Sequence, residues 1–291
     1  MPELAPERVA TATFPLRYED IAQDGRMMAT ALPPAVGWTV WTQLLADHPS
    51  AESMERQGLV AILSRLTVDA SDEPIRVDQP VVSTGGYQLA RSEKDGAVDK
   101  LFLNMWVEVR GARGRIVPPE GPGPAVVAGR VFAEHTFTRL FAPPDQRRVT
   151  RLEAPGLPAV PDTLHAFAPA LTAMELPAGA TPLDDDYLPD DAVTVFGLDH
   201  TDSNQHVNSL VYPRMFAEAA FRRLAARDQR PRRALVRSLD IAYRKPSFAG
   251  DRVRIHTRTF QLGDRVGAAG FLADADDPQI RPRCCARILL G

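Results

Sequence analysis

One ten-residue stretch holds most of the groups in this sequence that could do chemistry. Residues 199–208 read Asp-His-Thr-Asp-Ser-Asn-Gln-His-Val-Asn, which places two carboxylates, two imidazoles and several amides between a predicted strand and a predicted helix. The start of a helix has unpaired N–H groups and a positive dipole end that can stabilise an oxyanion. A neighbouring carboxylate or imidazole can activate water. The stretch predicts an acyl-transfer site, and the alternative is a loop of caps and turns.

The elements that must position these groups are a strand before the stretch and a helix after it. Residues 193–197 predict the strand, and Asn208 or Ser209 can cap a helix that runs to about Ala226, with Pro213 tolerated in its first turn. Apolar residues cover most of this helix, as expected where a sheet wraps around it. Further strands are predicted at 238–243, 251–260, 265–273 and 281–290.

The first half of the chain has the same order of elements. Residues 14–18 predict a short strand, 37–45 an apolar helix, 59–68 the next strand, and 126–140 a long last strand. The clearest strand is 100–110, where Leu, Leu, Met, Val and Val alternate with other residues at a period of two. Trp38 and Trp41 on the predicted helix are either ordinary core or the lining of an acyl tunnel.

A weak internal repeat favours two copies of one fold. Leu66, Val68 and Asp78 match Leu239, Ile241 and Asp251 at a common offset, and residues 18–27 fall against 198–207. In the second match Asp24 lies near Asn204 and Arg26 near His206, so the first copy has lost its base, because arginine stays protonated. We expect domains at 8–142 and 190–291. The proline-rich connection 143–189 joins them, with a short helix within 162–174 and a solvated acidic turn at 184–186.

The second half also resembles a known family. Asp202, Asn204, Gln205, His206, Val207 and Asn208, with Tyr212, resemble the signature of acyl-acyl carrier protein thioesterases, and more loosely the 4-hydroxybenzoyl-CoA thioesterase-like hot-dog enzymes. Residues 238–247 followed by Gly250 and Asp251 are similar to the family's strand before a catalytic Glu-Cys pair. The resemblance implies an α+β fold of two fused hot-dog domains, each a curved antiparallel sheet wrapped around a long helix. It also implies a fatty acyl thioester substrate.

The site residues carry over in part. Asp202, Asn204 and His206 stand at the positions of the family's catalytic residues, but Pro246 and Ser247 replace its Glu and Cys. A mechanism in which Asp202 or His206 activates water survives, with Ser247 as a group that orients the water. Substrate binding is expected from four residues, Asn208, Ser209, Leu210 and Tyr212. Asp199 and His200 are additional candidates.

Composition restricts the class of protein. The 291 residues carry a formal charge of −3, and the arginine cluster at 230–233 is too short for a nucleic-acid footprint. No apolar run reaches the ~20 residues of a membrane span, and the N-terminus has no secretory pattern. The adjacent Cys284 and Cys285 fit neither a disulfide framework nor a CxxC metal site. We therefore expect a cytoplasmic protein without cofactor or metal, and leave a homodimer open.

Three functions remain open. The first is hydrolysis of an acyl-CoA or acyl-carrier-protein thioester, for which the second half carries the site. The second is a non-catalytic acyl-thioester-binding module, which the missing Glu-Cys pair motivates. The third is a hydratase or dehydratase acting on 3-hydroxyacyl thioesters.

Overall fold

The structure, a computed structural model, describes residues 2–227, 234–277 and 281–291, and the chain forms two compact units. Unit 1 consists of Met1–Met27, Ala31–Leu66 and Ser71–Ala168. Unit 2 consists of Met28–Thr30, Thr67–Ala70 and Pro169–Gly291. The arginine cluster at 230–233 lies outside the described residues. The connection predicted at 143–189 is divided between the units at Ala168.

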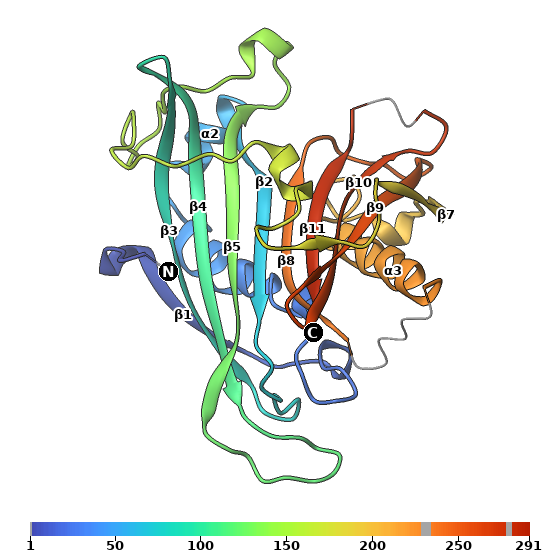
Figure 1. Ribbon diagram of the computed structural model, residues 1–291. Helices are drawn as coiled ribbons and strands as arrows, with labels where there is room; N and C mark the ends of the chain where they lie inside the picture. The colour runs from blue at the N-terminus through green and yellow to red at the C-terminus, as the bar shows by residue number, and fades with distance from the viewer. Residues whose placement is uncertain (1, 228–233, 278–280) are drawn as a thin grey trace. The chain divides into compact units, whose positions relative to one another are not determined.

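Unit 1 is built on a sheet with the strand order β1, β3, β4, β5 and β2 (Figure 1). The bounds are β1 Val9–Phe14, β2 Leu59–Ala70, β3 Val81–Lys94, β4 Ala97–Ala112 and β5 Ala125–Arg139, and the end of β2, Thr67–Ala70, belongs to unit 2. β3 pairs antiparallel with both β1 and β4, and β4 pairs antiparallel with β5. The alternation read from 100–110 is confirmed, since Leu101, Met105 and Val109 are fully buried on one face of β4.

The strand expected at 14–18 is wrong. The strand β1 ends at Phe14, and the 3-10 turn η2 covers Tyr18–Asp20. Pro15 follows the last strand residue and has no N–H to continue the ladder. The first strand therefore lies five residues earlier than its apolar residues suggested.

Short helical segments lie before β1, between β1 and β2, and after β5. They are η1 Pro6–Arg8, η3 Ala29–Ala31, α1 Pro34–Val36, η4 Gly37–Leu45, α2 Ala51–Arg56 and η5 Pro144–Gln146. The predicted helix at 37–45 is confirmed as η4, which is wound as a π-helix and packs against β1 and β3. Trp38 and Trp41 are 56% and 39% exposed, so the interpretation of both as ordinary core is wrong.

The proline-rich segment up to Ala168 lies along unit 1. The Arg91 N–H donates to the carbonyl of Thr163 at 2.9 Å, and the His165 N–H donates to the carbonyl of Arg91 at 2.8 Å. These bonds use the part of β3 beyond its pairing with β1, which ends at Gly86. The segment then crosses the sheet face, where the Phe167 ring stacks on Phe102 of β4.

This crossing buries a polar cluster. Ser64 Oγ donates to Glu134 Oε1 at 2.7 Å, and His165 Nε2 lies 2.5 Å from Glu134 Oε2. On the other side of the ring, Asn104 Nδ2 lies 3.3 Å from His165 Nδ1. An amide nitrogen can only donate, so in this arrangement Nδ1 accepts from Asn104 and the Nε2–H donates to Glu134. Asn104 of β4 and Glu134 of β5 are each only 2% exposed, and this cluster gives both buried side chains a hydrogen-bond partner.

His135, the next residue on β5, gives unit 1 a pH-dependent stability. Burial lowers its pKa from 6.5 to about 4. Between these values the unfolded chain binds a proton that the folded chain does not. The free energy of unfolding is therefore unaffected by this histidine above pH 6.5 and falls as the pH drops toward 4. The loss is expected to be about 3 kcal/mol. Denaturant unfolding of the parent and of His135→Gln at pH 7 and pH 4 measures it, and an equal loss in both chains would contradict this assignment.

Unit 2 has the strand order β8, β11, β10, β9 and β6, with β7 also paired to β9 (Figure 1). The bounds are β6 Thr181–Pro182, β7 Leu188–Val195, β8 Val236–Tyr243, β9 Arg252–Leu262, β10 Arg265–Asp274 and β11 Cys284–Leu290. The 3-10 turns are η6 Ala170–Met174 and η7 Leu198–His200, and the helix α3 covers Val211–Ala225. α3 packs on one face of β8 to β11 and buries Tyr212, Phe216 and Leu224.

The solvated turn predicted at 184–186 is confirmed for Asp185 and Asp186, which are exposed, but is wrong for Asp184. Asp184 is 3% exposed, and its Oδ2 accepts from the backbone N–H of Thr259 on β9 at 2.8 Å. Arg223 and Arg227 at the end of α3 both bind Asp184 Oδ1. Burial opposes ionisation of this carboxyl, but the bonds from Thr259 and the two arginines outweigh it and lower its pKa. One carboxylate thus joins the end of α3 to β9.

Cys284 and Cys285 are fully buried in β11, as their interpretation as small apolar residues of the last strand predicted. Burial raises the pKa of both thiols. Among the described residues, no helix is both long and apolar enough to cross a membrane.

Candidate active site

The backbone of residues 201–207 folds back on itself. Thr201 and Val207 form an antiparallel bridge, and the Asp202 N–H donates to the carbonyl of His206 at 3.1 Å. The Gln205 N–H donates to the carbonyl of Asp202 at 2.9 Å, and Gln205 has a φ of 64°. This tight turn brings Asp202 and His206 to the same end of the loop.

The Asp202 carboxylate is oriented by two donors. Its Oδ1 accepts from the Asn204 N–H at 2.9 Å, and its Oδ2 accepts from Asn208 Nδ2 at 3.2 Å. The side chain remains 25% exposed. An ionised carboxylate can accept further hydrogen bonds at each oxygen, so a water molecule can still reach this one.

The His206 ring lies beside Asp202 and is more exposed. Its Nδ1 is 4.0 Å from Asp202 Oδ1 and 3.3 Å from the carbonyl oxygen of Val207, and the side chain is 42% exposed. Two acceptors near Nδ1 favour the tautomer with the proton on that nitrogen. The Nε2 of the neutral ring then has a free lone pair with which it can accept a proton.

The amides before α3 differ in their availability. The Asn208 N–H donates to the carbonyl of His200 at 2.9 Å, and the Leu210 N–H donates to Asn208 Oδ1 at 2.9 Å. Within the described part of the chain, the Ser209 N–H has no acceptor. The expected cap by Asn208 or Ser209 is wrong, because the helix is preceded by Leu210 and the Asn208 side chain closes a turn before it.

Ser247 lies behind the loop and is fully buried. Its carbonyl accepts from the Val207 N–H at 2.8 Å. Within the described residues, no hydrogen-bond partner of acceptable geometry meets its hydroxyl. The Tyr212 phenol nevertheless lies next to it. Burial raises the pKa of Tyr212, and the contact with Ser247 acts in the opposite direction. The Ser247 and Tyr212 side chains both lie on the buried side of the loop.

The remaining predicted residues have separate positions. Asn204 is exposed at the tip of the turn. The His200 Nδ1 accepts from the Gly197 N–H at 2.9 Å, which uses that nitrogen to hold η7, and Asp199 Oδ1 lies 3.6 Å from it. Tyr243, whose role was not predicted from the sequence, donates from its hydroxyl to the carbonyl of Ser209 at 2.9 Å. This bond fixes the backbone that carries the free amide.

Solved structures with this fold include thioesterases. An acyl-ACP thioesterase from Bacteroides thetaiotaomicron is similar with a TM-score of 0.60 and 12% identity, covering 97% of this chain and 98% of that chain. The 12:0-ACP thioesterase from Umbellularia californica is similar with a TM-score of 0.61 and 13% identity, covering 97% and 94%. The chain has the fold of the tandem hot-dog thioesterases. No family model and no curated protein matches the sequence.

The two halves of this tandem hot-dog fold share the backbone of the loop. In unit 1, Ile21 and Met27 form the antiparallel bridge, and the Ala22 N–H donates to the carbonyl of Arg26 at 2.9 Å. The Gly25 N–H donates to the carbonyl of Ala22 at 2.9 Å, and Gly25 has a φ of 87°. These are the bonds of residues 201–207, shifted by a constant 180 positions. The predicted match of residues 18–27 with 198–207 is therefore confirmed.

The side chains on the two loops differ. Ala22 stands where unit 2 has Asp202, and Arg26 stands where it has His206. Arg26 Nε lies 2.8 Å from Asp24 Oδ2, and its other end lies 3.2 Å from Asp72. In this loop of the hot-dog fold an arginine thus replaces the imidazole and cannot act as a base, and the Asp24 carboxylate is paired with that arginine.

A buried arginine holds the turn behind the unit 2 loop of this hot-dog fold. Arg283 is 5% exposed and donates to Asp251 and to the carbonyl of Pro246, which precedes Ser247. Its other amino group lies 3.3 Å from Asp274 Oδ2. In the sequence, this arginine stands directly before two cysteines of the predicted last strand. A buried guanidinium requires a partner, so its position could have indicated a buried ion pair.

No group of three or more His, Cys, Asp or Glu side chains in the described ranges is arranged to hold a metal ion.

Proposed function

We propose that this chain hydrolyses acyl thioesters by attack of water at residues 201–210 of unit 2. The observation that carries the proposal is the Asp202 carboxylate, which two donors orient and which stays exposed beside His206. Asp202 or His206 takes a proton from water while the water oxygen bonds to the thioester carbonyl carbon. When the C–S bond breaks, the sulfur leaves as a thiolate and receives that proton.

The oxyanion of the intermediate is assigned to the Ser209 N–H. This amide precedes α3 and has no acceptor among the described residues, whereas those of Asn208 and Leu210 are engaged. A backbone donor that is already oriented stabilises developing charge without reorganisation. Asn208 and Leu210 then shape the backbone on either side of the donor, and Tyr212 packs beneath it.

Two further residues complete the proposed mechanism. The Asn204 side chain, exposed at the tip of the turn, orients the water or the thioester carbonyl. Ser247 supports the loop through its carbonyl bond to Val207, because its hydroxyl is buried away from the solvent. This mechanism does without the Glu-Cys pair that Pro246 and Ser247 replace.

The proposed substrate is a fatty acyl chain on coenzyme A or on an acyl carrier protein. The two solved structures described above act, by their names, on acyl-ACP, which supports the carrier protein without deciding against coenzyme A. The proposed setting is fatty acid metabolism in the cytoplasm, with no cofactor and no nucleic acid as partner. A homodimer of the fused chain is part of the same proposal.

A non-catalytic acyl-binding module is the second candidate. It is favoured by the side chains at Pro246 and Ser247, which bring no carboxylate to the loop from the following turn. A hydratase or dehydratase acting on 3-hydroxyacyl thioesters is the third candidate, and it would use the same Asp202 and His206.

Release of free thiol decides among the three. We expect the full chain to release thiol from acyl-CoAs or acyl-ACPs of some chain length between 4 and 16 carbons, at a rate well above a buffer blank. Loss of enoyl absorbance without thiol release would instead support the hydratase. Saturable binding of acyl-CoA with neither reaction would support the binding module.

A further inference from the structure

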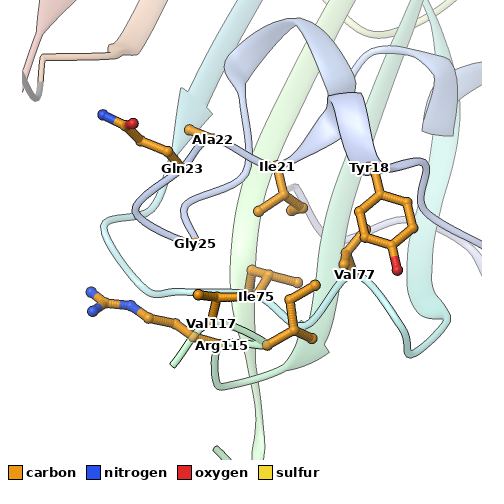
Figure 2. Close-up of a pocket in the computed structure, with 10 residues that line it drawn as sticks. Tyr18, Ile21, Ala22, Gln23, Gly25, Ile75, Val77, Arg115 and Val117 are labelled. Atoms are coloured by element: carbon orange, nitrogen blue, oxygen red, sulfur yellow. The ribbon is translucent and has the colours of Figure 1, made fainter. Parts of the chain in front are cut away.

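Unit 1 contains a pocket of about 190 Å³ beside the loop of residues 21–27 (Figure 2). One wall is the loop itself, with Ile21, Ala22 and Gly25. The opposite wall comes from Ile75 and from residues 115–117, which follow β4. In Figure 2 the Ile75 and Val117 side chains face the loop from below, and Tyr18 lies at one end.

The walls of this pocket are joined by backbone hydrogen bonds. The Ile75 N–H donates to the carbonyl of Gly25 at 2.8 Å, and the Gly114 N–H donates to the carbonyl of Pro74 at 3.1 Å. Arg115 packs directly on the loop, since a Cβ at residue 25 would lie 2.9 Å from its Cγ. The pocket is therefore formed before any ligand arrives.

The charge at the pocket is unbalanced. Four nearby arginines each have a carboxylate partner within 3.0 Å: Arg17 with Asp20, Arg26 with Asp24, Arg76 with Asp78 and Arg113 with Glu73. The Arg115 guanidinium has no carboxylate within ion-pair distance in the described part of the chain. The Glu120 carboxylate binds the Arg115 backbone N–H at 3.1 Å instead. One cation thus borders an apolar space.

Apolar side chains at the rim are open to solvent. Tyr18 is 75% exposed and Val117 is 76% exposed, while Ile75 and Val77 form a buried floor. An apolar ligand would cover this exposed surface. A cavity of about 150 Å³ can hold one benzene molecule, so the present volume accommodates a tail of about six carbons.

We infer that this pocket binds a short-chain carboxylate, with the acid group at Arg115 and the tail between Ile21, Ile75 and Val117. The apolar lining excludes a fully polar anion such as phosphate, and the arginine distinguishes an acid from an alcohol. Hydrolysis of a thioester yields such an acid, so its source in the cell rests on the proposed function. The binding itself does not.

Titration of the ¹⁵N-labelled full chain with sodium hexanoate tests this inference. We expect saturable shifts of the Gly25, Arg115 and Val117 amides, and an affinity at least about fivefold weaker in Arg115→Met, which lacks the charge-assisted hydrogen bond. Arg113→Met is the matched control, because Arg113 is two residues away, is paired with Glu73 and lies outside the pocket. Its affinity should equal that of the parent.

Two further ligands separate charge from tail. Acetate has the charge without the tail and hexanol has the tail without the charge, so each should bind more weakly than hexanoate. Equal affinity of Arg115→Met and the parent, equal affinity for hexanol and hexanoate, or no saturable shift at these amides would each overturn the inference. Because no step measures hydrolysis, an inactive chain that binds hexanoate here would refute the proposed function alone.

Discussion

Asp202→Asn is expected to slow thioester hydrolysis about 100- to 10,000-fold, the range that positioned acid–base catalysis contributes. The asparagine can still accept the Asn204 N–H, so the turn keeps its shape, but it cannot take a proton from water. His206→Ala is expected to lower the rate by a similar factor if the ring is the base. Steady-state thiol release at saturating acyl thioester measures both variants.

The first unit supplies the control for these variants. Asp24→Asn alters a carboxylate on the matching loop of unit 1, where Asp24 is paired with Arg26. Its rate should remain within about twofold of the parent. Circular dichroism and the melting temperature of each variant establish that it is folded. If Asp202→Asn and His206→Ala both hydrolyse at the parent rate, the assignment of the site to this loop is wrong.

Asp184→Ala is expected to destabilise unit 2 by about 1–3 kcal/mol, the cost of leaving a buried hydrogen-bond donor without its partner. The substitution leaves the Thr259 N–H without its acceptor and removes the carboxylate that Arg223 and Arg227 share. The lowered pKa of Asp184 also makes the stability of the parent depend on pH. The parent should lose this stabilisation in acid, as the carboxyl becomes protonated, and the variant should have none to lose.

The neighbouring carboxylate in the same acidic run provides the comparison. Asp185 is exposed, and Asp185→Ala should change the free energy of unfolding by less than about 0.5 kcal/mol. Denaturant unfolding followed by circular dichroism measures both variants. If the two substitutions changed the free energy of unfolding equally, the bonds of Asp184 to α3 and β9 would add no stability beyond that of an exposed aspartate in the same run.

Strands with regular alternation were predictable from the sequence, whereas β3 was not. This strand contains Gly85 and Gly86, and glycine lowers the propensity for a strand. The structure explains both residues. A Cβ at Gly86 would lie 2.2 Å from the carbonyl oxygen of Arg8, and one at Gly85 would lie 2.5 Å from the carbonyl oxygen of Trp106. Close approach of neighbouring backbones required glycine where local preference argued against a strand.

The candidate site was predictable as a stretch of sequence but not as a set of contacts. The types and spacing of Asp202 and His206 indicated a reactive loop, and its two neighbouring elements are in the structure. Nothing in the sequence distinguished the free N–H of Ser209 from the engaged one of Leu210, because this depends on which amides the side chain of Asn208 meets. The burial of Ser247 likewise depends on Tyr212 and on a turn held by a distant arginine, Arg283.

The bonds that shape residues 21–27 and 201–207 involve main-chain atoms, so this corner of a hot-dog domain keeps its form when its side chains change. After a gene duplication, mutation can therefore erase reactivity from one copy while the protein still folds. The same independence is useful in protein engineering. Ala22 and Arg26 are the positions at which aspartate and histidine would reinstall the missing pair, on a scaffold that already has the required curvature.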